Sequence, residues 1–191
     1  MDRRRLRAAA AEYPYLRGLF GVPLGALFLV SALGNWEWGP FRHDWVFVAA
    51  VLAIAGVVAL INRYYNDHYG RVTPSARNQL LVLGLGVTAV AVMLGITTLL
   101  RSRAGWSLDL PVNPIPVAFG LFMLGYYAVL VEVRPHHVVV WGSLVFVGVL
   151  PVWDGADPGN VGLLLTGAAA VVNGVLDHLA LERSFEAASA H

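Results

Sequence analysis

The chain has 191 residues, of which 58% are hydrophobic and 13% are charged, with a formal net charge of +1. Soluble domains contain roughly 45–50% apolar and about 25% charged residues, so this composition excludes an ordinary water-soluble globular protein. The absence of Cys also excludes disulfides, thiolate metal sites and cysteine nucleophiles.

Six apolar runs follow one another along the chain, and nearly all charged residues lie between them. Each run is close to the ~20 residues that an α-helix needs to cross the hydrocarbon core of a bilayer. The pattern predicts an all-α, polytopic membrane protein, a six-transmembrane-helix bundle that forms one membrane domain over residues 1–191. The expected spans are 16–34, 45–61, 80–100, 114–133, 138–153 and 161–181.

The first span follows a basic N-terminus and carries a GxxxG motif at Gly21 and Gly25. Small residues four apart allow two helices to approach closely, so we expect this face to pack inside the bundle. The run is long enough to span, and Asn35-Trp36-Glu37 follows it instead of a small-residue cleavage site. These features favour a permanent span over a signal peptide.

The segment after the second span is the densest polar stretch of the chain and mixes three Tyr with three Arg. Such a segment could grip an anionic lipid headgroup or dock a cytoplasmic partner such as an ATPase subunit. The simpler interpretation is an aromatic and positively charged anchor at the membrane surface. The contact residues in either case are Arg63, Tyr64, Tyr65, Tyr69, Arg71 and Arg77.

The sixth span carries a regular stripe of small and polar residues. They recur at steps of three and four, which places them on one face of a helix, and we expect that face to contact other helices. The stripe consists of Gly162, Thr166, Ala170, Asn173 and Asp177. Asp177 is therefore expected to point into the bundle.

The arginines predict the orientation of the chain. If the N-terminus is cytoplasmic, ten of the thirteen arginines lie on the cytoplasmic side, which satisfies the positive-inside rule. Both termini are then cytoplasmic, and a multi-pass protein of the cell (plasma) membrane is expected. The complete absence of Lys, with many Ala, Val, Gly and Leu, indicates a GC-rich and hence bacterial coding sequence.

Acids and histidines gather where the second, fourth and sixth spans reach the cytoplasm. Imidazole and carboxylate groups together can bind zinc or exchange protons, but ordinary packing and pairing with arginines at the interface is the simplest interpretation. The candidate cluster is Asp67, His68, Glu132, His136, His137, Asn173, Asp177 and His178. No His-Glu-x-x-His spacing supports metal ligation. The sequence therefore neither predicts nor excludes a bound metal ion, and no cofactor is predicted.

Function is constrained mainly by what the chain lacks. No charged residue lies in the middle of a predicted span, which disfavours a carrier with carboxylates at the membrane centre. The sequence also contains no enzyme motif and no nucleic-acid-binding patch. No catalytic residue is predicted, and an enzyme is the less favoured class. We expect a transport-associated or complex-forming membrane subunit that works in the lipid bilayer, as a homo-oligomer or with a separate cytoplasmic subunit. Two alternatives are an enzyme that acts on a lipid-like substrate at the cytoplasmic face and a sensory or regulatory protein with interfacial histidines.

Overall fold

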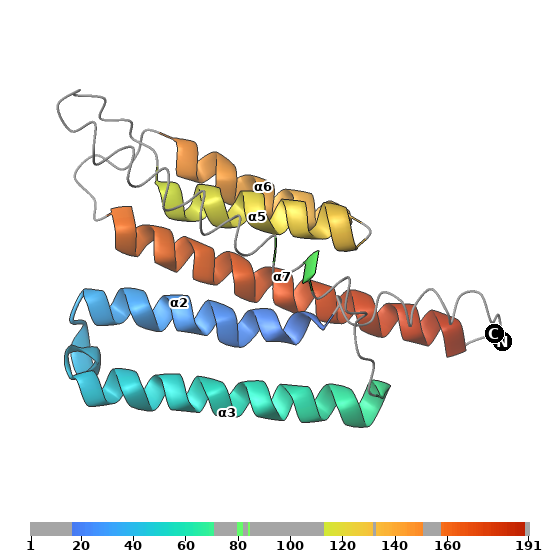
Figure 1. Cartoon of the computed structure of the whole chain (residues 1–191), viewed down its shortest axis with the longest axis horizontal. Helices are drawn as coiled ribbons and strands as arrows, with labels where there is room; N and C mark the ends of the chain where they lie inside the picture. The colour runs from blue at the N-terminus through green and yellow to red at the C-terminus, as the bar shows by residue number, and fades with distance from the viewer. Residues whose placement is uncertain are drawn as a thin grey trace.

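The computed structural model describes residues 17–70, 80–81, 84, 113–131, 133–150 and 158–189. Every regular element in these ranges is a helix (Figure 1), which confirms the all-α class for the described part of the chain. The elements are η1 (Gly18–Phe20), α2 (Gly21–Asn35), η2 (Gly39–Arg42), α3 (Asp44–Tyr69), α5 (Pro114–Leu130), α6 (Pro135–Val149) and α7 (Pro158–Ser189).

Three helical segments are long and apolar enough to cross a membrane, namely Gly18–Asn35, Asp44–Tyr69 and Gly159–Phe185. They correspond to the first, second and sixth predicted spans and are what an integral membrane protein requires. Helices α5 and α6 are apolar but shorter, with 17 and 15 residues. The third predicted span, 80–100, lies almost entirely outside the described residues, so the count of six spans stays a prediction.

Two helices continue past the apolar runs that predicted them. Helix α3 ends at Tyr69 and α7 ends at Ser189, although the runs end at residues 61 and 181. Polar residues can extend a helix beyond the hydrocarbon core because the backbone satisfies its own hydrogen bonds. Helix α5 instead begins where predicted, at Pro114, and the side chain of Asn113 caps it by accepting a hydrogen bond from the Ile115 amide at 3.3 Å.

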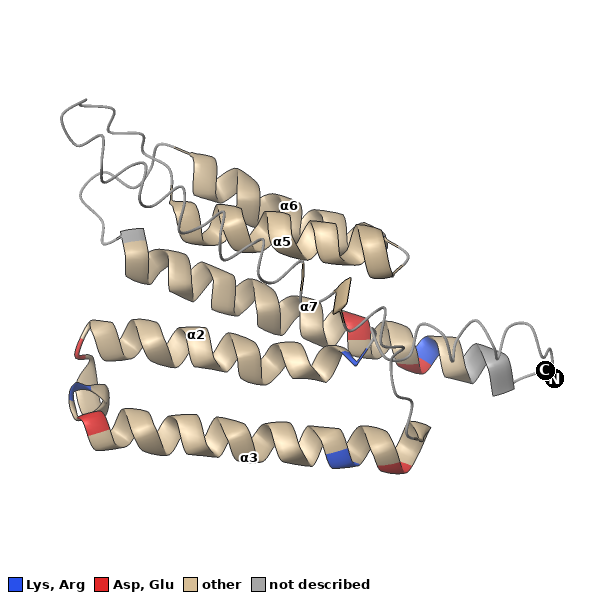
Figure 2. Ribbon diagram, in the orientation of Figure 1, with Lys and Arg blue, Asp and Glu red and all other residues tan. Residues whose placement is uncertain are grey.

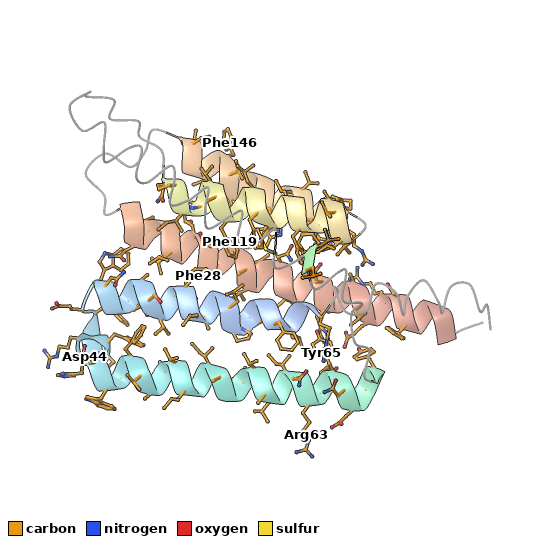
Figure 3. All side chains as sticks on the ribbon, viewed as in Figure 1. Phe28, Asp44, Arg63, Tyr65, Phe119 and Phe146 are labelled. Carbon is orange, nitrogen blue, oxygen red and sulfur yellow. The ribbon has the colours of Figure 1, made fainter. Side chains whose placement is uncertain are left out.

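Helix α7 lies in the middle of the arrangement, with α2 and α3 on one side and α5 and α6 on the other (Figure 1). The two sides also meet directly, because Phe28 of α2 and Phe119 of α5 make an edge-to-face contact with ring centroids 5.3 Å apart (Figure 3). Helix α2 contains no charged residue, and those of α3 lie at or near its ends, whereas α7 carries charged residues within its second half (Figure 2).

Glycines hold α2 close to α7. A Cβ added to Gly21 would lie 2.7 Å from the carbonyl oxygen of Ala170, and one on Gly25 would come even closer to the backbone of Gly167. Real Cβ contacts do not occur under 3.0 Å, so only glycine fits at these two positions. The prediction that the GxxxG motif packs inside the bundle is confirmed.

The stripe predicted on the sixth span is buried in the structure. Gly162, Thr166, Ala170, Asn173 and Asp177 are all buried. Ala170 packs in an apolar cluster with Tyr127 of α5 and with Trp141 and Leu144 of α6. The polar members of the stripe are thereby held inside the bundle.

Candidate functional site

The candidate site centres on the carboxylate of Asp177, which is 1% exposed on α7. Its Oδ1 atom accepts hydrogen bonds from Nε2 of His136 at 2.9 Å and Nε2 of His137 at 2.7 Å. Its Oδ2 atom accepts from the hydroxyl of Tyr127 at 2.5 Å and from Nδ2 of Asn173 at 2.8 Å. Four donors from α5, α6 and α7 therefore converge on one buried side chain.

The hydrogen-bond pattern fixes where the protons lie. Nδ1 of His137 accepts from the backbone N–H of Arg134 at 3.1 Å, so in the neutral ring Nε2 carries the hydrogen that Asp177 receives. The Tyr127 hydroxyl accepts from Nδ2 of Asn173 at 2.7 Å, which leaves its own hydrogen for Asp177. A carboxyl group whose two oxygens both accept in this way is an ionised carboxylate.

The structure favours this hydrogen-bonded carboxylate over a metal centre. His136, His137 and Asp177 do offer ligand atoms within 4.8 Å of one another. A histidine that binds a metal usually donates its other ring N–H to a carbonyl or carboxylate group. In His137 that other nitrogen accepts from the Arg134 amide, so ligation through Nε2 would bring two N–H groups face to face. The Arg134 N–H beside His137 is a donor where a metal-bound histidine needs an acceptor.

A pocket of about 180 Å³ lies beside Asp177, between η1, α2, α5, α6 and α7. Within the described part of the chain, Nε1 of Trp141 and Oδ1 of Asn173, which belong to two of the residues that line it, have no hydrogen-bond partner. These residues are only 1% and 3% exposed. The polar lining residues are Arg17, Tyr126, Tyr127, Trp141, Asn173 and Asp177, and the larger apolar ones are Phe20, Leu24 and Met123.

A second histidine centre lies on the opposite side of α7. The hydroxyl of Tyr65 accepts from the Leu19 amide at 3.1 Å and lies 3.2 Å from Nδ1 of His178. Nε2 of His178 lies 3.3 Å from a carboxylate oxygen of Glu182. In the neutral ring, Nε2 donates to Glu182 and Nδ1 accepts from Tyr65. This series of hydrogen bonds, which we call the His178 chain, links α3, η1 and α7.

The predicted cluster is brought together only in part. His136, His137 and Asn173 meet at Asp177. Asp67 does not join them and instead forms an exposed ion pair with Arg63 at 3.6 Å. His68 is also exposed, and its Nδ1 lies 3.0 Å from the carbonyl oxygen of Tyr64. Glu132 lies outside the described residues.

The predicted contact residues after the second span also differ in their exposure. The Arg63 side chain is 82% exposed and points away from the bundle (Figure 3), so it is available to a headgroup or partner. Tyr65 is fully buried and packs against Leu181. Tyr69 is half-buried, and its ring lies 5.0 Å from that of Phe185. Arg71 and Arg77 lie outside the described residues.

Arg17 and Trp141 also belong to the site, although the sequence did not single them out. Trp141 lies four residues after His137, so the two share one face of α6, and that spacing is the signal that could have identified it. Arg17 was counted only as a positive-inside charge. Its guanidinium lies 5.1 Å from the ring centroid of Tyr65, and it donates to Oδ1 of Asn62 at 3.1 Å, contacts that depend on the packing of η1 against α3.

Comparison with known proteins found no matching family model, no similar curated protein and no similar solved structure. No family membership is therefore available as a guide to activity. What the protein does has to be inferred from the Asp177 carboxylate and the pocket beside it.

Proposed function

We propose that the chain is a transport-associated integral membrane protein that binds a small polar solute in the pocket beside Asp177. One observation carries this proposal: Nε1 of Trp141 and Oδ1 of Asn173 are buried at this pocket and have no hydrogen-bond partner among the described residues. A buried polar group without a partner costs about 1–3 kcal/mol. The pocket therefore offers one hydrogen-bond donor and one acceptor inside an apolar bundle. This pair favours a bound molecule that can both accept and donate hydrogen bonds.

The pocket suits a small solute. Its volume of about 180 Å³ is slightly larger than the ~150 Å³ of an engineered cavity that holds benzene. Water fits as well, because it offers both donors and acceptors, and several water molecules would connect the pocket to the Asp177 carboxylate. Phe20, Leu24 and Met123 add an apolar wall, so the favoured solute has a hydroxyl or amino group on a short apolar body.

We also propose the topology that the sequence predicts, with six spans and both termini in the cytoplasm. Helices α5 and α6 form an antiparallel pair joined by a short connection, as expected for a hairpin that enters and leaves the membrane. Asp177 then lies in the cytoplasmic half of the last span. A homo-oligomer or a separate energising subunit in the cytoplasm remains part of the proposal, with the exposed Arg63 and Asp67 pair as an accessible surface.

The enzyme and the histidine sensor receive less support. Each oxygen of Asp177 already accepts two hydrogen bonds. This carboxylate is therefore better placed to hold three helices together than to take a proton from a substrate. Among the described residues, the exposed His68 that the sensor interpretation includes makes only a local bond to Tyr64.

Site-directed cysteine labelling tests the proposal, since the natural chain contains no Cys. Met123→Cys places a thiol in the pocket wall, whereas Phe146→Cys places one on the outer face of α6, where Phe146 is 62% exposed and points away from the bundle (Figure 3). A membrane-impermeant thiosulfonate reacts with the thiolate, which forms in water and not in lipid. We expect Met123→Cys to react about tenfold or more faster than the Phe146→Cys control.

The side from which the reagent enters separates the possible outcomes. Labelling in both intact cells and inverted vesicles supports passage of a solute through the pocket. Labelling from the cytoplasmic side alone supports a binding site and contradicts transport. Equal, slow labelling of both variants from both sides would show a dry pocket and would overturn the proposal.

A further inference from the structure

A buried hydroxyl group lies outside the Asp177 pocket, closer to the beginning of α7. The side chain belongs to Thr166, which is 0% exposed and does not line that pocket. Within the described part of the chain, its Oγ1 atom has no hydrogen-bond partner. A hydroxyl group that is buried without a partner costs free energy, so this position favours a bound molecule that supplies the missing hydrogen bond.

Two serines show how a hydroxyl group inside a helix usually finds its partner. Ser31 of α2 and Ser184 of α7 each donate to the carbonyl oxygen four residues earlier, at 2.8 Å in both cases. Such a bond needs no second helix. The same bond from Thr166 would run to Gly162, which the structure also describes, and it is not formed. The hydroxyl group of Thr166 is therefore not used by its own helix.

Thr166 lies on the same face of α7 as the residues of the pocket. It precedes Ala170 by four positions and Asn173 by seven, which correspond to one and two turns of the helix. Ala170 lines the pocket and packs against Trp141. The level of Thr166 on α7 is therefore about one turn, or roughly 6 Å, beyond the pocket. The side chain that lies between the two levels on this face is the small methyl group of Ala170.

Polar side chains continue on the far side of Thr166. Asn113 packs against α7 one turn before it, where a Cβ added to Gly162 would lie 2.6 Å from Nδ2 of Asn113. At the beginning of α7, Oδ1 of Asn160 accepts a hydrogen bond from Nδ2 of Asn35 at 2.8 Å. Asn113 and Asn160 are both buried. Thr166 thus lies between the buried polar side chains at the beginning of α7 and those of the pocket.

Three polar atoms where α7 meets its neighbours lack a partner among the described residues, and they differ in the bonds they can make. Nε1 of Trp141 only donates and Oδ1 of Asn173 only accepts, whereas the hydroxyl group of Thr166 can do either. A ketone only accepts and would leave Asn173 without a partner. An ammonium group only donates and would leave Trp141 without one. A solute hydroxyl group suits all three positions.

We propose that Thr166 is a second binding position for the solute of the Asp177 pocket and that it binds the solute through a hydroxyl group. The inference rests on the proposed solute pocket and extends it by about one turn along α7. A solute that moves from the pocket toward the beginning of the helix would exchange its bonds to Trp141 and Asn173 for a bond to Thr166.

The test compares two cysteine variants of the full-length chain in membrane vesicles. Thr166→Cys replaces the hydroxyl group by a thiol, and Ala168→Cys is the matched control, because Ala168 lies two residues further along α7 and is exposed. The probe is hydroxyethyl methanethiosulfonate, which carries a hydroxyl group on a short chain. Because the reactive thiolate forms in a polar environment, we expect the probe to label Thr166→Cys about tenfold or more faster than Ala168→Cys.

Met123→Cys, in the pocket wall, separates the failure of this inference from the failure of the pocket itself. Fast labelling of both Met123→Cys and Thr166→Cys supports the second binding position. Fast labelling of Met123→Cys with Thr166→Cys as slow as Ala168→Cys would overturn it and leave the pocket in place. Slow labelling of all three variants would overturn both. Circular dichroism verifies that each variant is folded.

Thr166→Val is a second test that needs no thiol, because valine has nearly the shape of threonine without the hydroxyl group. If a polar molecule occupies this position, valine removes one of its hydrogen bonds, and the melting temperature of the purified protein should fall by about 2–4 °C. A melting temperature above that of the natural protein would show that the hydroxyl group is buried without a ligand, and would overturn the proposal.

Discussion

Asp177 and His178 are neighbours in sequence, yet they serve two different parts of the molecule. Adjacent residues of a helix point about 100° apart, so Asp177 faces α5 and α6 while His178 faces α3. The Asp177 carboxylate is 1% exposed and receives four hydrogen bonds. The His178 chain instead ends at Glu182, whose side chain is 40% exposed.

The difference shows how burial determines the number of partners a polar group requires. A charge inside an apolar bundle is tolerated only when several fixed dipoles replace water, and Asp177 obtains them from three helices. Glu182 retains contact with water and needs one neighbour. Asp177 should therefore control the packing of α5, α6 and α7, while His178 should have a local role. The experiments below test that contrast, from the largest expected effect to the smallest.

The largest effect is expected from removing the carboxylate. Asp177→Ala leaves the donors of His137, Asn173 and Tyr127 buried without their acceptor, and should lower the free energy of unfolding by about 3–5 kcal/mol. Glu182→Gln should cost less than about 1 kcal/mol, because its pair is partly exposed. Unfolding by sodium dodecyl sulfate in mixed micelles measures both. Equal losses in the two variants would contradict the contrast between the two sides of α7.

A smaller effect is expected where α2 touches α7. Gly25→Ala forces a methyl group against the Gly167 backbone and should destabilise the protein by about 1–3 kcal/mol. Gly56 of α3 has open space around it, so Gly56→Ala should stabilise the protein by about 0.5–1 kcal/mol through helix propensity alone. Thermal unfolding in detergent measures the sign of the stability change in each variant. A neutral Gly25→Ala would mean that α2 does not lie against α7 in this way.

Double-mutant cycles measure whether the two sides of α7 are energetically separate. Tyr127 and Asn173 share a hydrogen bond and a common acceptor, so Tyr127→Phe and Asn173→Ala should show a coupling energy of about 0.5–3 kcal/mol. Tyr127→Phe and Tyr65→Phe act on opposite sides and should add within about 0.5 kcal/mol. Strong coupling between the two tyrosines would show that the His178 chain and the Asp177 site are one network.

The smallest effect is expected from metal ions. Because Nδ1 of His137 accepts from the Arg134 amide, adding Zn²⁺ or a chelator should leave the melting temperature of the purified protein unchanged. A rise of the melting temperature with Zn²⁺ that disappears in His136→Gln would instead identify a metal site. His43→Gln serves as the control, since His43 is exposed and lies outside the Asp177 site.

The sequence predicted the helices better than their contacts. Apolar runs located α2, α3 and α7 because a helix that crosses a membrane must match the thickness of its core, and they also located the shorter helices α5 and α6. The steps of three and four on the sixth span also predicted that Asp177 points inward, since helical period alone decides which residues share a face.

The partners of Asp177 could not be predicted in the same way. That His137 and Tyr127 reach Asp177, whereas Asp67 does not, depends on how α5, α6 and α3 pack around α7. Glycine contacts such as that of Gly120 with the Trp141 backbone set this packing, and a single sequence does not identify the partner of each glycine. The inward orientation of Tyr65 was missed for the same reason, because its helix extends beyond the apolar run on which the prediction was based.

Infrared difference spectroscopy tests most directly the central claim that Asp177 is an ionised carboxylate serving four donors. The spectrum of the protein in lipid is compared with that of Asp177→Asn. The structure predicts that the variant loses carboxylate stretching bands and that no protonated carboxyl band disappears with them. A protonated carboxyl C=O band that is present in the natural protein and absent from the variant would contradict the claim.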